Sequence, residues 1–176
     1  MGEVMNINLG CGSDIRPGWV NVDYKSGPGV DLRFDLTKPF PLVDDCAQTV
    51  CLSHVLEHLS NWPEAVAECH RILRPGGMLH IRVPYGVGKH NPDADHVRFF
   101  WPRTIDVFIG KDSPGLDARH FNDRFERVSI TVLRYFWFYN QIKAFRRIKH
   151  RFPIGVKIEI VYVLRKTGVG PDGATA

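Results

Sequence analysis

The stretch Asn6-Ile7-Asn8-Leu9-Gly10-Cys11-Gly12 decides the fold, together with Asp23, which follows eleven residues later. Its apolar residues predict a buried β-strand, and its glycines predict a tight turn directly after that strand. Glycines let backbone N–H groups approach a ligand closely, and an acid at the tip of the next strand can accept hydrogen bonds from ribose hydroxyls. The pattern therefore predicts an α/β protein that holds an adenosine-bearing molecule.

The spacing of this motif argues against a dinucleotide. A dinucleotide site needs a third glycine, a full helix whose N-terminus holds the pyrophosphate, and an acid roughly 20 residues further on. Here Ile15 stands in place of the third glycine, and Pro17-Gly18 ends any helix within about one turn. S-adenosylmethionine carries no phosphate, so a glycine turn and scattered carboxylates can hold it without a long helix.

The rest of the chain alternates predicted strands and helices, which indicates a parallel sheet. The helix with the clearest apolar face starts at Ser60-Asn61, which can cap it, and ends before Pro75-Gly76-Gly77, with Arg71 and Arg74 complementing its C-terminal dipole. The predicted strands cover 5–9, 19–23, 31–34, 47–52, 78–83, 128–133 and 156–164.

Five ordered motifs carry a family resemblance. They are Asn8-Leu9-Gly10-Cys11-Gly12, Pro17-Gly18-Trp19-Val20-Asn21-Val22-Asp23, Asp35-Leu36, Ser53-His54-Val55-Leu56-Glu57-His58 and Leu73-Arg74-Pro75-Gly76-Gly77. The chain resembles the class I S-adenosylmethionine-dependent methyltransferases, in the small bacterial branch related to the type 11 methyltransferase domain. The resemblance implies a Rossmann-like α/β fold, with a mostly parallel seven-stranded sheet, an antiparallel last strand and a shortened first helix. It further implies a single domain over 1–167, and 168–176 is predicted to be a disordered tail.

The resemblance implies S-adenosyl-L-methionine as cofactor, with S-adenosyl-L-homocysteine as its product. Asp23 is the predicted ribose ligand, and Asp35-Leu36 matches the place where relatives hold adenine. A surface turn acid before Pro39 is the alternative interpretation of Asp35. The complete predicted cofactor set is Leu9, Gly10, Cys11, Gly12, Asp23, Asp35, Leu36, Ser53 and His54.

Histidines next to acids raise the questions of a metal and of a catalytic base. If the segment is helical, His54, Glu57 and His58 share one face, and two imidazoles with one carboxylate could bind a divalent metal. Some related O-methyltransferases bind a metal through Glu-x-x-Glu-His, but this chain has His54 in place of the first Glu, and we assign no metal to these three residues. Residues 84–125 are predicted to form a substrate lid. Imidazole titrates near neutrality, so His96 is the predicted general base, oriented by Asp95. A lid histidine bonded to backbone is the alternative, and His120 is a weaker candidate.

Positive charge is concentrated in one segment. Residues 134–151 contain six basic residues and no acid, interleaved with aromatic side chains. We predict a basic aromatic helix over 134–152, whose default role is packing, including a homodimer contact. Peripheral contact with an anionic membrane surface is the next interpretation, and nucleic acid is disfavoured because no further basic stripe is present.

Compartment and chemistry follow from the remaining features. No apolar run approaches the roughly 20 residues that a spanning helix needs, and the N-terminus enters a strand at once. We expect a cytoplasmic protein with four reduced cysteines, in which the basic segment would make any contact with the inner membrane face.

The expected activity is methyl transfer to a hydroxyl of a small molecule or sugar, in cell-surface polysaccharide synthesis. A non-catalytic S-adenosylmethionine-binding protein and an NAD-dependent oxidoreductase or epimerase are the two rivals.

Overall fold

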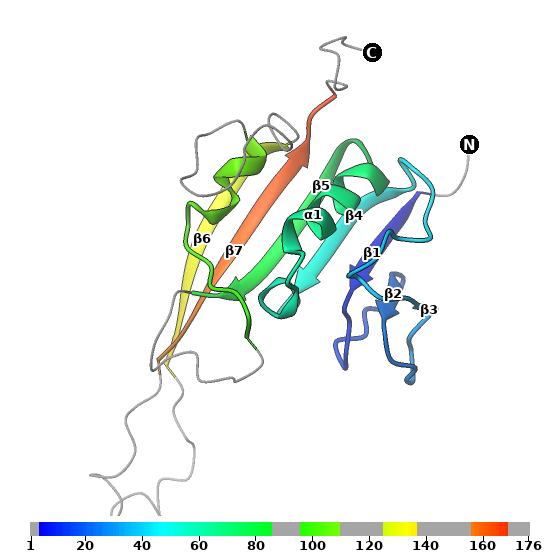
Figure 1. Cartoon of the computed structure of the whole chain (residues 1–176), viewed down its shortest axis with the longest axis horizontal. Coiled ribbons are helices and arrows are strands. Elements are labelled where there is room, and N and C mark those ends of the chain that lie inside the picture. The colour runs from blue at the N-terminus through cyan, green and yellow to red at the C-terminus, as the bar shows by residue number, and fades with distance from the viewer. Residues whose placement is uncertain (1–3, 86–95, 110–124, 137–155, 169–176) are drawn as a thin grey trace, which may run out of the picture.

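The computed structural model describes residues 4–85, 96–109, 125–136 and 156–168, and its core is one seven-stranded sheet (Figure 1). The strands are β1 (Met5–Leu9), β2 (Val20–Asp23), β3 (Leu32–Arg33), β4 (Ala47–Ser53), β5 (Leu73–Pro84), β6 (Phe125–Phe136) and β7 (Val156–Lys166). Their order is β3-β2-β1-β4-β5-β7-β6. Strands β1 to β5 pair in parallel, and β7 is antiparallel to both β5 and β6. The predicted fold class, with its reversed last strand, is confirmed.

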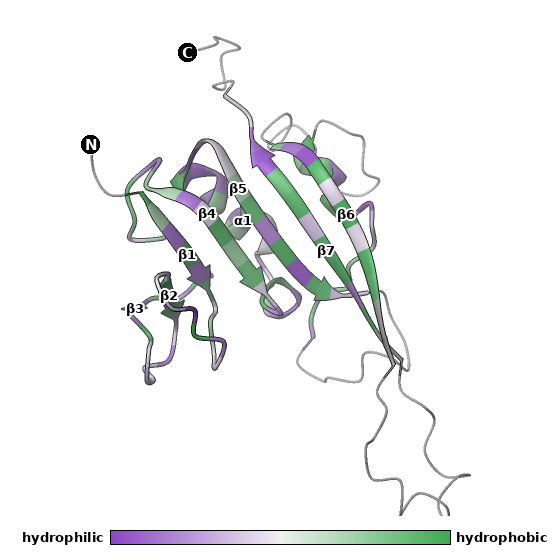
Figure 2. Ribbon diagram, turned by 180° about the vertical axis from the view of Figure 1, so that it is seen from behind, coloured by the Kyte–Doolittle hydropathy of each residue, from purple (hydrophilic) through white to green (hydrophobic). Residues whose placement is uncertain are grey.

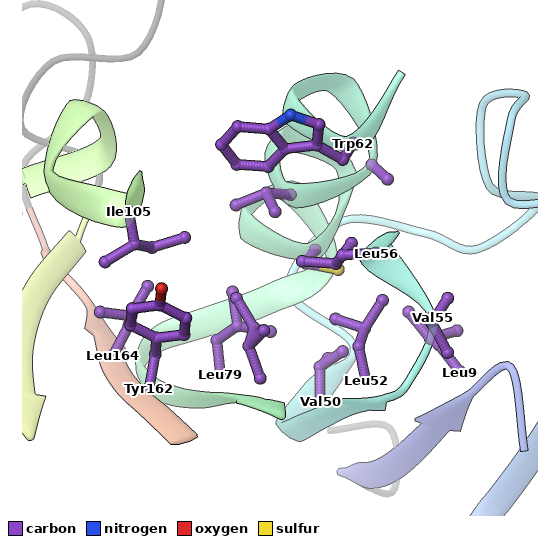
Figure 3. Packing of buried hydrophobic residues seen from close by; sticks show 14 of the residues in the cluster. Leu9, Val50, Leu52, Val55, Leu56, Trp62, Leu79, Ile105, Tyr162 and Leu164 are labelled. Atoms are coloured by element: carbon purple, nitrogen blue, oxygen red, sulfur yellow. The ribbon is translucent and has the colours of Figure 1, made fainter. Parts of the chain in front are cut away.

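The hydrophobic core lies on one face of this sheet, beneath α1 (Trp62–Ile72) (Figure 3). Side chains alternate along a strand, so the inward residues of β4, Val50 and Leu52, are fully buried. The indole of Trp62 contacts Phe100 and Phe108 edge to face, at ring-centroid distances of 5.4 and 5.7 Å. Each such aromatic pair adds about 0.5–1.5 kcal/mol beyond its buried area.

Helix α1 differs at its ends from the prediction. The side chain of Asn61 makes no capping hydrogen bond, and its Nδ2 instead donates to the Thr37 carbonyl at 3.1 Å. At the other end, Arg71 does more than complement the helix dipole. Its guanidinium donates to the Glu68 carboxylate at 2.7 Å and to the carbonyl of Phe40 at 3.0 Å. Both side chains therefore tie α1 to the loop that precedes β4.

The connection between β1 and β2 contains no helix. The first helix, which was predicted to be short, is therefore absent. Two buried asparagines, Asn8 and Asn21, hold the turns that replace it. The Asn8 amide donates to the Asp14 carbonyl at 2.7 Å and to Asn21 Oδ1 at 3.2 Å. Asn21 Oδ1 also accepts the Arg16 N–H at 2.9 Å, and its amide donates to the Arg16 and Trp19 carbonyls at 3.1 and 3.2 Å. Side-chain amides thus satisfy backbone groups that a helix would have satisfied internally.

The substitution Asn21→Ala is expected to destabilise the protein by about 2 kcal/mol, because it removes a partner of the buried Asn8 amide and the partners of partly buried backbone groups at Arg16 and Trp19. Urea unfolding followed by circular dichroism measures the change. Asn61→Ala is the matched control, since the Asn61 amide makes one exposed hydrogen bond and its loss should cost less. Equal losses in the two variants would contradict the role given to Asn21.

One predicted segment differs from the structure, and another, the predicted lid, is described only in part. The predicted helix over 134–152 is wrong at its start, because residues 134–136 continue β6 and pair with β7. Cross-strand pairing there outweighs the amphipathic pattern that suggested a helix. Within the predicted lid over 84–125, residues Thr104–Ile109 form the 3-10 helix η2, whose Ile105 and Phe108 lie in the core. The remainder of the basic segment, 137–152, lies outside the described residues, as does the predicted tail from 169 onward.

Hydrophilic and hydrophobic residues alternate along the central strands (Figure 2), and the polar ones Thr49, His80 and Arg82 belong to the face opposite the core. A shallow cavity of about 450 Å³ lies on this face, between the β1–β2 turns and the outward residues of β4 and β5. Among the described residues, α1 and η2 both pack on the core side. Nowhere in the described ranges is a helix long and apolar enough to cross a lipid bilayer.

All four cysteines are free thiols, as predicted. Three of them, Cys11, Cys51 and Cys69, are buried, and Cys46 is partly buried. Burial raises the pKa of each thiol above its ordinary value, because the thiolate would lose its hydration. Their chemistry is therefore that of unreactive packing residues.

Candidate functional site

A cavity of about 430 Å³ opens at the edge of the sheet where β1, β2 and β4 end. Ligands of open α/β sheets bind at this carboxyl edge, and the volume lies within the range of small-molecule sites, about 300–1,000 Å³. The lining residues are Gly10, Asp23, Tyr24, Asp35, Leu36, His54, Val55, His58 and Leu59. Five of the nine predicted cofactor residues therefore meet in one cavity. Leu9, Cys11 and Gly12 lie beside its lining, and Ser53 faces the cavity on the other side of the sheet.

Gly10 must be glycine for two separate reasons. Its φ is +66°, in the left-handed region that side chains disfavour. A Cβ at this position would also lie 2.4 Å from Cγ2 of Val55, far inside van der Waals contact. The absent side chain leaves backbone exposed to the cavity, as the glycine motif predicts.

Asp23 shapes the glycine turn as well as the cavity. One carboxylate oxygen accepts the Gly12 N–H at 2.9 Å, and the other accepts the Lys25 N–H at 2.9 Å. The side chain is 9% exposed, at the end of β2. Each carboxylate oxygen has more than one acceptor direction, so both can still accept a hydroxyl hydrogen bond from a ligand. The geometry of Asp23 is suitable for binding ribose hydroxyls, and its role as ribose ligand stays a prediction.

Asp35 and Leu36 line the cavity in different ways. Asp35 is exposed and accepts the backbone N–H and the hydroxyl of Thr37, at 2.9 and 2.7 Å. These hydrogen bonds lower the pKa of the Asp35 carboxyl, so it stays ionised. Leu36 is buried and gives the cavity an apolar wall, which suits a purine ring. The turn role and the cavity role of Asp35 are thus compatible.

His54 lies in a charged cluster directly after β4. Its φ is +57°, an uncommon conformation for a non-glycine residue that often marks functional sites. Its Nδ1 lies 3.2 Å from Oε1 of Glu57, and its Nε2 lies 3.1 Å from Oε1 of Glu159. Arg82 Nε donates to the second oxygen of Glu159 at 2.6 Å. Both glutamates are at most 1% exposed, so the imidazole is fixed between two buried carboxylates at the cavity wall.

His96 lies against His58, with the two ring centroids 4.8 Å apart. The segment that carries it is anchored, because the N–H groups of Val97 and Arg98 both donate to the Glu57 carbonyl, at 2.9 and 3.1 Å. The predicted base is therefore beside the cavity wall formed by His58. Asp95, its predicted orienting partner, and His120 lie outside the described residues.

Sequence reasoning missed part of the cavity and of the charged cluster. Tyr24, Val55 and Leu59 line the cavity as direct neighbours of predicted residues, and their spacing gives no separate signal. Glu159 did carry a signal, since it is the one acid of β7, between the apolar residues Ile158 and Ile160. Such an acid is rarely buried without partners, but its partners on other strands cannot be identified from spacing.

The topology and the glycine-lined cavity define a Rossmann-like α/β protein with a ligand site at the carboxyl edge of its sheet. Residues 7–81 match the family model described as "Methyltransferase domain". A Mycolicibacterium smegmatis protein named "Probable S-adenosylmethionine-dependent methyltransferase" is 28% identical over 151 residues, which cover 65% of this chain and 59% of that protein. The chain thus spans less than two thirds of this relative.

Solved structures share the fold. A S-adenosylmethionine-dependent methyltransferase from Archaeoglobus fulgidus superposes with a TM-score of 0.60 at 14% identity, covering 94% of this chain and 87% of that chain. A Burkholderia thailandensis 1,6-didemethyltoxoflavin N1-methyltransferase with bound S-adenosylhomocysteine gives a TM-score of 0.56 at 16% identity, covering 93% and 71%. Residues 7–81 thus resemble a methyltransferase domain, and the described sheet shares the fold of solved S-adenosylmethionine-dependent methyltransferases.

Proposed function

We propose that this protein binds S-adenosylmethionine in the cavity at the carboxyl edge of the sheet and transfers its methyl group to a small acceptor. The observation that carries the proposal is that Gly10 and Asp23 both line that cavity. The collision that a Cβ on Gly10 would make with Val55 shows that this turn needs glycine, which keeps the cavity edge free of a side chain. A cavity of about 430 Å³ is of the right order for a nucleoside ligand.

The residues present fit the cofactor. Asp23 would accept the ribose hydroxyls, Leu36 would contact the adenine ring, and the backbone at Gly10 would approach the methionine end, with His54 beside it. When bound, the cofactor supplies a methyl group on an electrophilic sulfonium. The protein's own contribution is to hold the reacting groups in line, and positioning of this kind supplies much of the rate of such a displacement.

The acceptor is proposed to be a hydroxyl of a small molecule or sugar, including glycans of cell-surface polysaccharide synthesis. Its place would be the side of the cavity near His58 and His96, with His96 as the proposed base and Asp95 as its orienting partner. A cytoplasmic location, with membrane or homodimer contacts through 134–152, belongs to the same proposal. The proposed place of the acceptor is supported by the imidazoles of His58, which lines the cavity, and of His96, which lies against His58.

Isothermal titration calorimetry with S-adenosylhomocysteine and, separately, with NAD⁺ tests the proposal. Binding of the first and not of the second is expected. Uptake of NAD⁺ alone would favour an oxidoreductase or epimerase and would overturn the proposal. A screen of hydroxyl-bearing acceptors with a methyl-labelled donor then separates an enzyme from a non-catalytic binder, which would bind the cofactor and transfer no label.

The substitution Asp23→Ala is expected to weaken binding of S-adenosylhomocysteine by about 1–3 kcal/mol, because it removes the ribose acceptor and the partner of the Gly12 N–H. Calorimetry measures the affinity. Asp31→Ala is a suitable control, since Asp31 Oδ2 accepts the Asn21 N–H at 2.7 Å but lies outside the cavity lining. An unchanged affinity in the Asp23 variant would refute its assignment.

A further inference from the structure

Glu57, His58 and His96 form a cluster of metal-binding groups at the acceptor side of the cavity. Each offers one ligand atom, and these atoms all lie within 4.8 Å of one another. The cluster joins two distant parts of the sequence, because Glu57 and His58 belong to the 3-10 helix η1 (Leu56–His58) after β4, whereas His96 follows β5. The anchoring of Val97 and Arg98 on the Glu57 carbonyl holds the two parts together.

The carboxylate of Glu57 is the unusual member of this cluster. The residue is 0% exposed, and neither of its carboxylate oxygens accepts an aligned hydrogen bond from the described residues. The nearest histidine nitrogen, His54 Nδ1, lies 3.2 Å from one of these oxygens, Oε1. Burying a carboxylate without hydrogen bonds is costly, and buried charges in proteins are normally paired or coordinate a metal. The second oxygen is therefore available to a cation.

We propose that Glu57, His58 and His96 bind one divalent transition-metal cation, with Zn²⁺ as the best match. Two imidazole nitrogens and one carboxylate oxygen form the ligand set of many catalytic zinc sites, in which a further position stays open to water or substrate. His58 is exposed and lines the cavity, so the open position would face the acceptor. The nitrogen preference of the two histidines disfavours Mg²⁺ and Ca²⁺.

The cation would define the acceptor as a molecule with a metal-binding oxygen, and this part of the inference rests on the proposed function. A hydroxyl bound to a divalent cation loses its proton more readily than a free one. Its oxygen then forms the bond to the methyl carbon, the carbon–sulfur bond breaks with its electron pair on sulfur, and the proton passes to water. His96 would then act as a metal ligand, which replaces both the general-base role proposed for it and the expectation that Glu57 and His58 bind no metal.

The test is calorimetric titration of the chelator-treated full chain with ZnCl₂. One Zn²⁺ per chain is expected. The variants H58A and H96A should each bind Zn²⁺ more weakly by well over about tenfold. Replacing a residue that merely supports a metal ligand already weakens binding by about tenfold, and loss of a ligand should cost more. His58 is exposed, so its replacement leaves the core unaffected, and circular dichroism verifies folding of each variant. H80A is the matched control, because His80 lines the cavity on the other face of the sheet and should leave Zn²⁺ affinity unchanged.

Wild-type affinity in both H58A and H96A, or an equal loss in H80A, would overturn the metal site, as would the absence of saturable Zn²⁺ binding. Titration of the metal-free chain with S-adenosylhomocysteine is run in parallel. Cofactor binding without Zn²⁺ binding would refute the metal site and leave the proposed function standing. Zn²⁺ binding without cofactor binding would refute the proposed function and the acceptor role, while the metal site itself would stand.

Discussion

Gly10→Ala is expected to destabilise the protein by about 2–5 kcal/mol, the sum of a strained left-handed backbone and an overpacked contact. The strain follows from the φ of +66°, and the overpacking follows from the 2.4 Å approach of a Cβ to Val55. Any relaxation must move the glycine turn or Val55, and both border the cavity. Affinity for S-adenosylhomocysteine should therefore fall as well. Chemical unfolding and calorimetry measure the two effects.

Gly12→Ala provides the matched control for this prediction. Gly12 also has a positive φ, of +49°, but no atom lies within 4 Å of the place where its Cβ would be. Its substitution should cost about 1–2 kcal/mol from backbone strain alone. The double variant Gly10→Ala/Val55→Ala should recover the steric part, as a coupling of at least about 0.5 kcal/mol in a double-mutant cycle. Strictly additive losses would show that Val55 is not the cause.

Glu159→Ala is expected to destabilise the protein by about 3 kcal/mol, because it removes the buried partner of both Arg82 and His54. The estimate lies at the lower end for a broken buried pair, since the Arg82 side chain is 40% exposed and can be partly hydrated. Loss of Glu159 also frees one side of the His54 imidazole at the cavity wall. Cofactor affinity should fall together with stability, which urea unfolding and calorimetry would show.

Glu126→Ala separates this effect from the loss of an ordinary surface ion pair. Glu126 lies on β6 and pairs with Arg165 at 3.4 Å, with both side chains exposed. Its removal should change stability by less than about 1 kcal/mol. A Glu159→Ala variant no less stable than Glu126→Ala would contradict the importance of the buried cluster. Glu159→Gln should fall between the two, because it keeps the shape and one acceptor oxygen.

Local patterns predicted the parallel half of the sheet well. The alternating apolar residues of Met5–Leu9 and the glycines after them produce β1 and its turn as expected. Helix α1 begins directly after its predicted cap and ends at Ile72, before Pro75 as predicted. These features depend on side-chain periodicity and on the conformational freedom of glycine, both of which are properties of short segments. The predicted N-cap of α1 is wrong, because the Asn61 side chain donates to the carbonyl of Thr37, 24 residues earlier in the chain.

Segments with competing local preferences were predicted less well. The aromatic and basic residues from 134 onward fit an amphipathic helix, yet 134–136 extend β6 because β7 offers an edge to pair with. Within the segment predicted as a lid, Ile105 and Phe108 lie in the core, and Phe108 packs against Trp62. In both cases a partner distant in sequence decided the outcome.

The sequence by itself determined the glycine turn, the acid at the end of β2 and the alternation of strands that makes this a methyltransferase-type sheet. Only the tertiary structure decided that Glu159 meets Arg82 and His54, and that His96 meets His58 beside the cavity. The physical reason is that turns and strands arise from interactions among neighbouring residues, whereas these clusters need the sheet order that places β7 next to β5. Contacts across such sequence distances exist only once the whole sheet has closed its hydrogen bonds and buried its core.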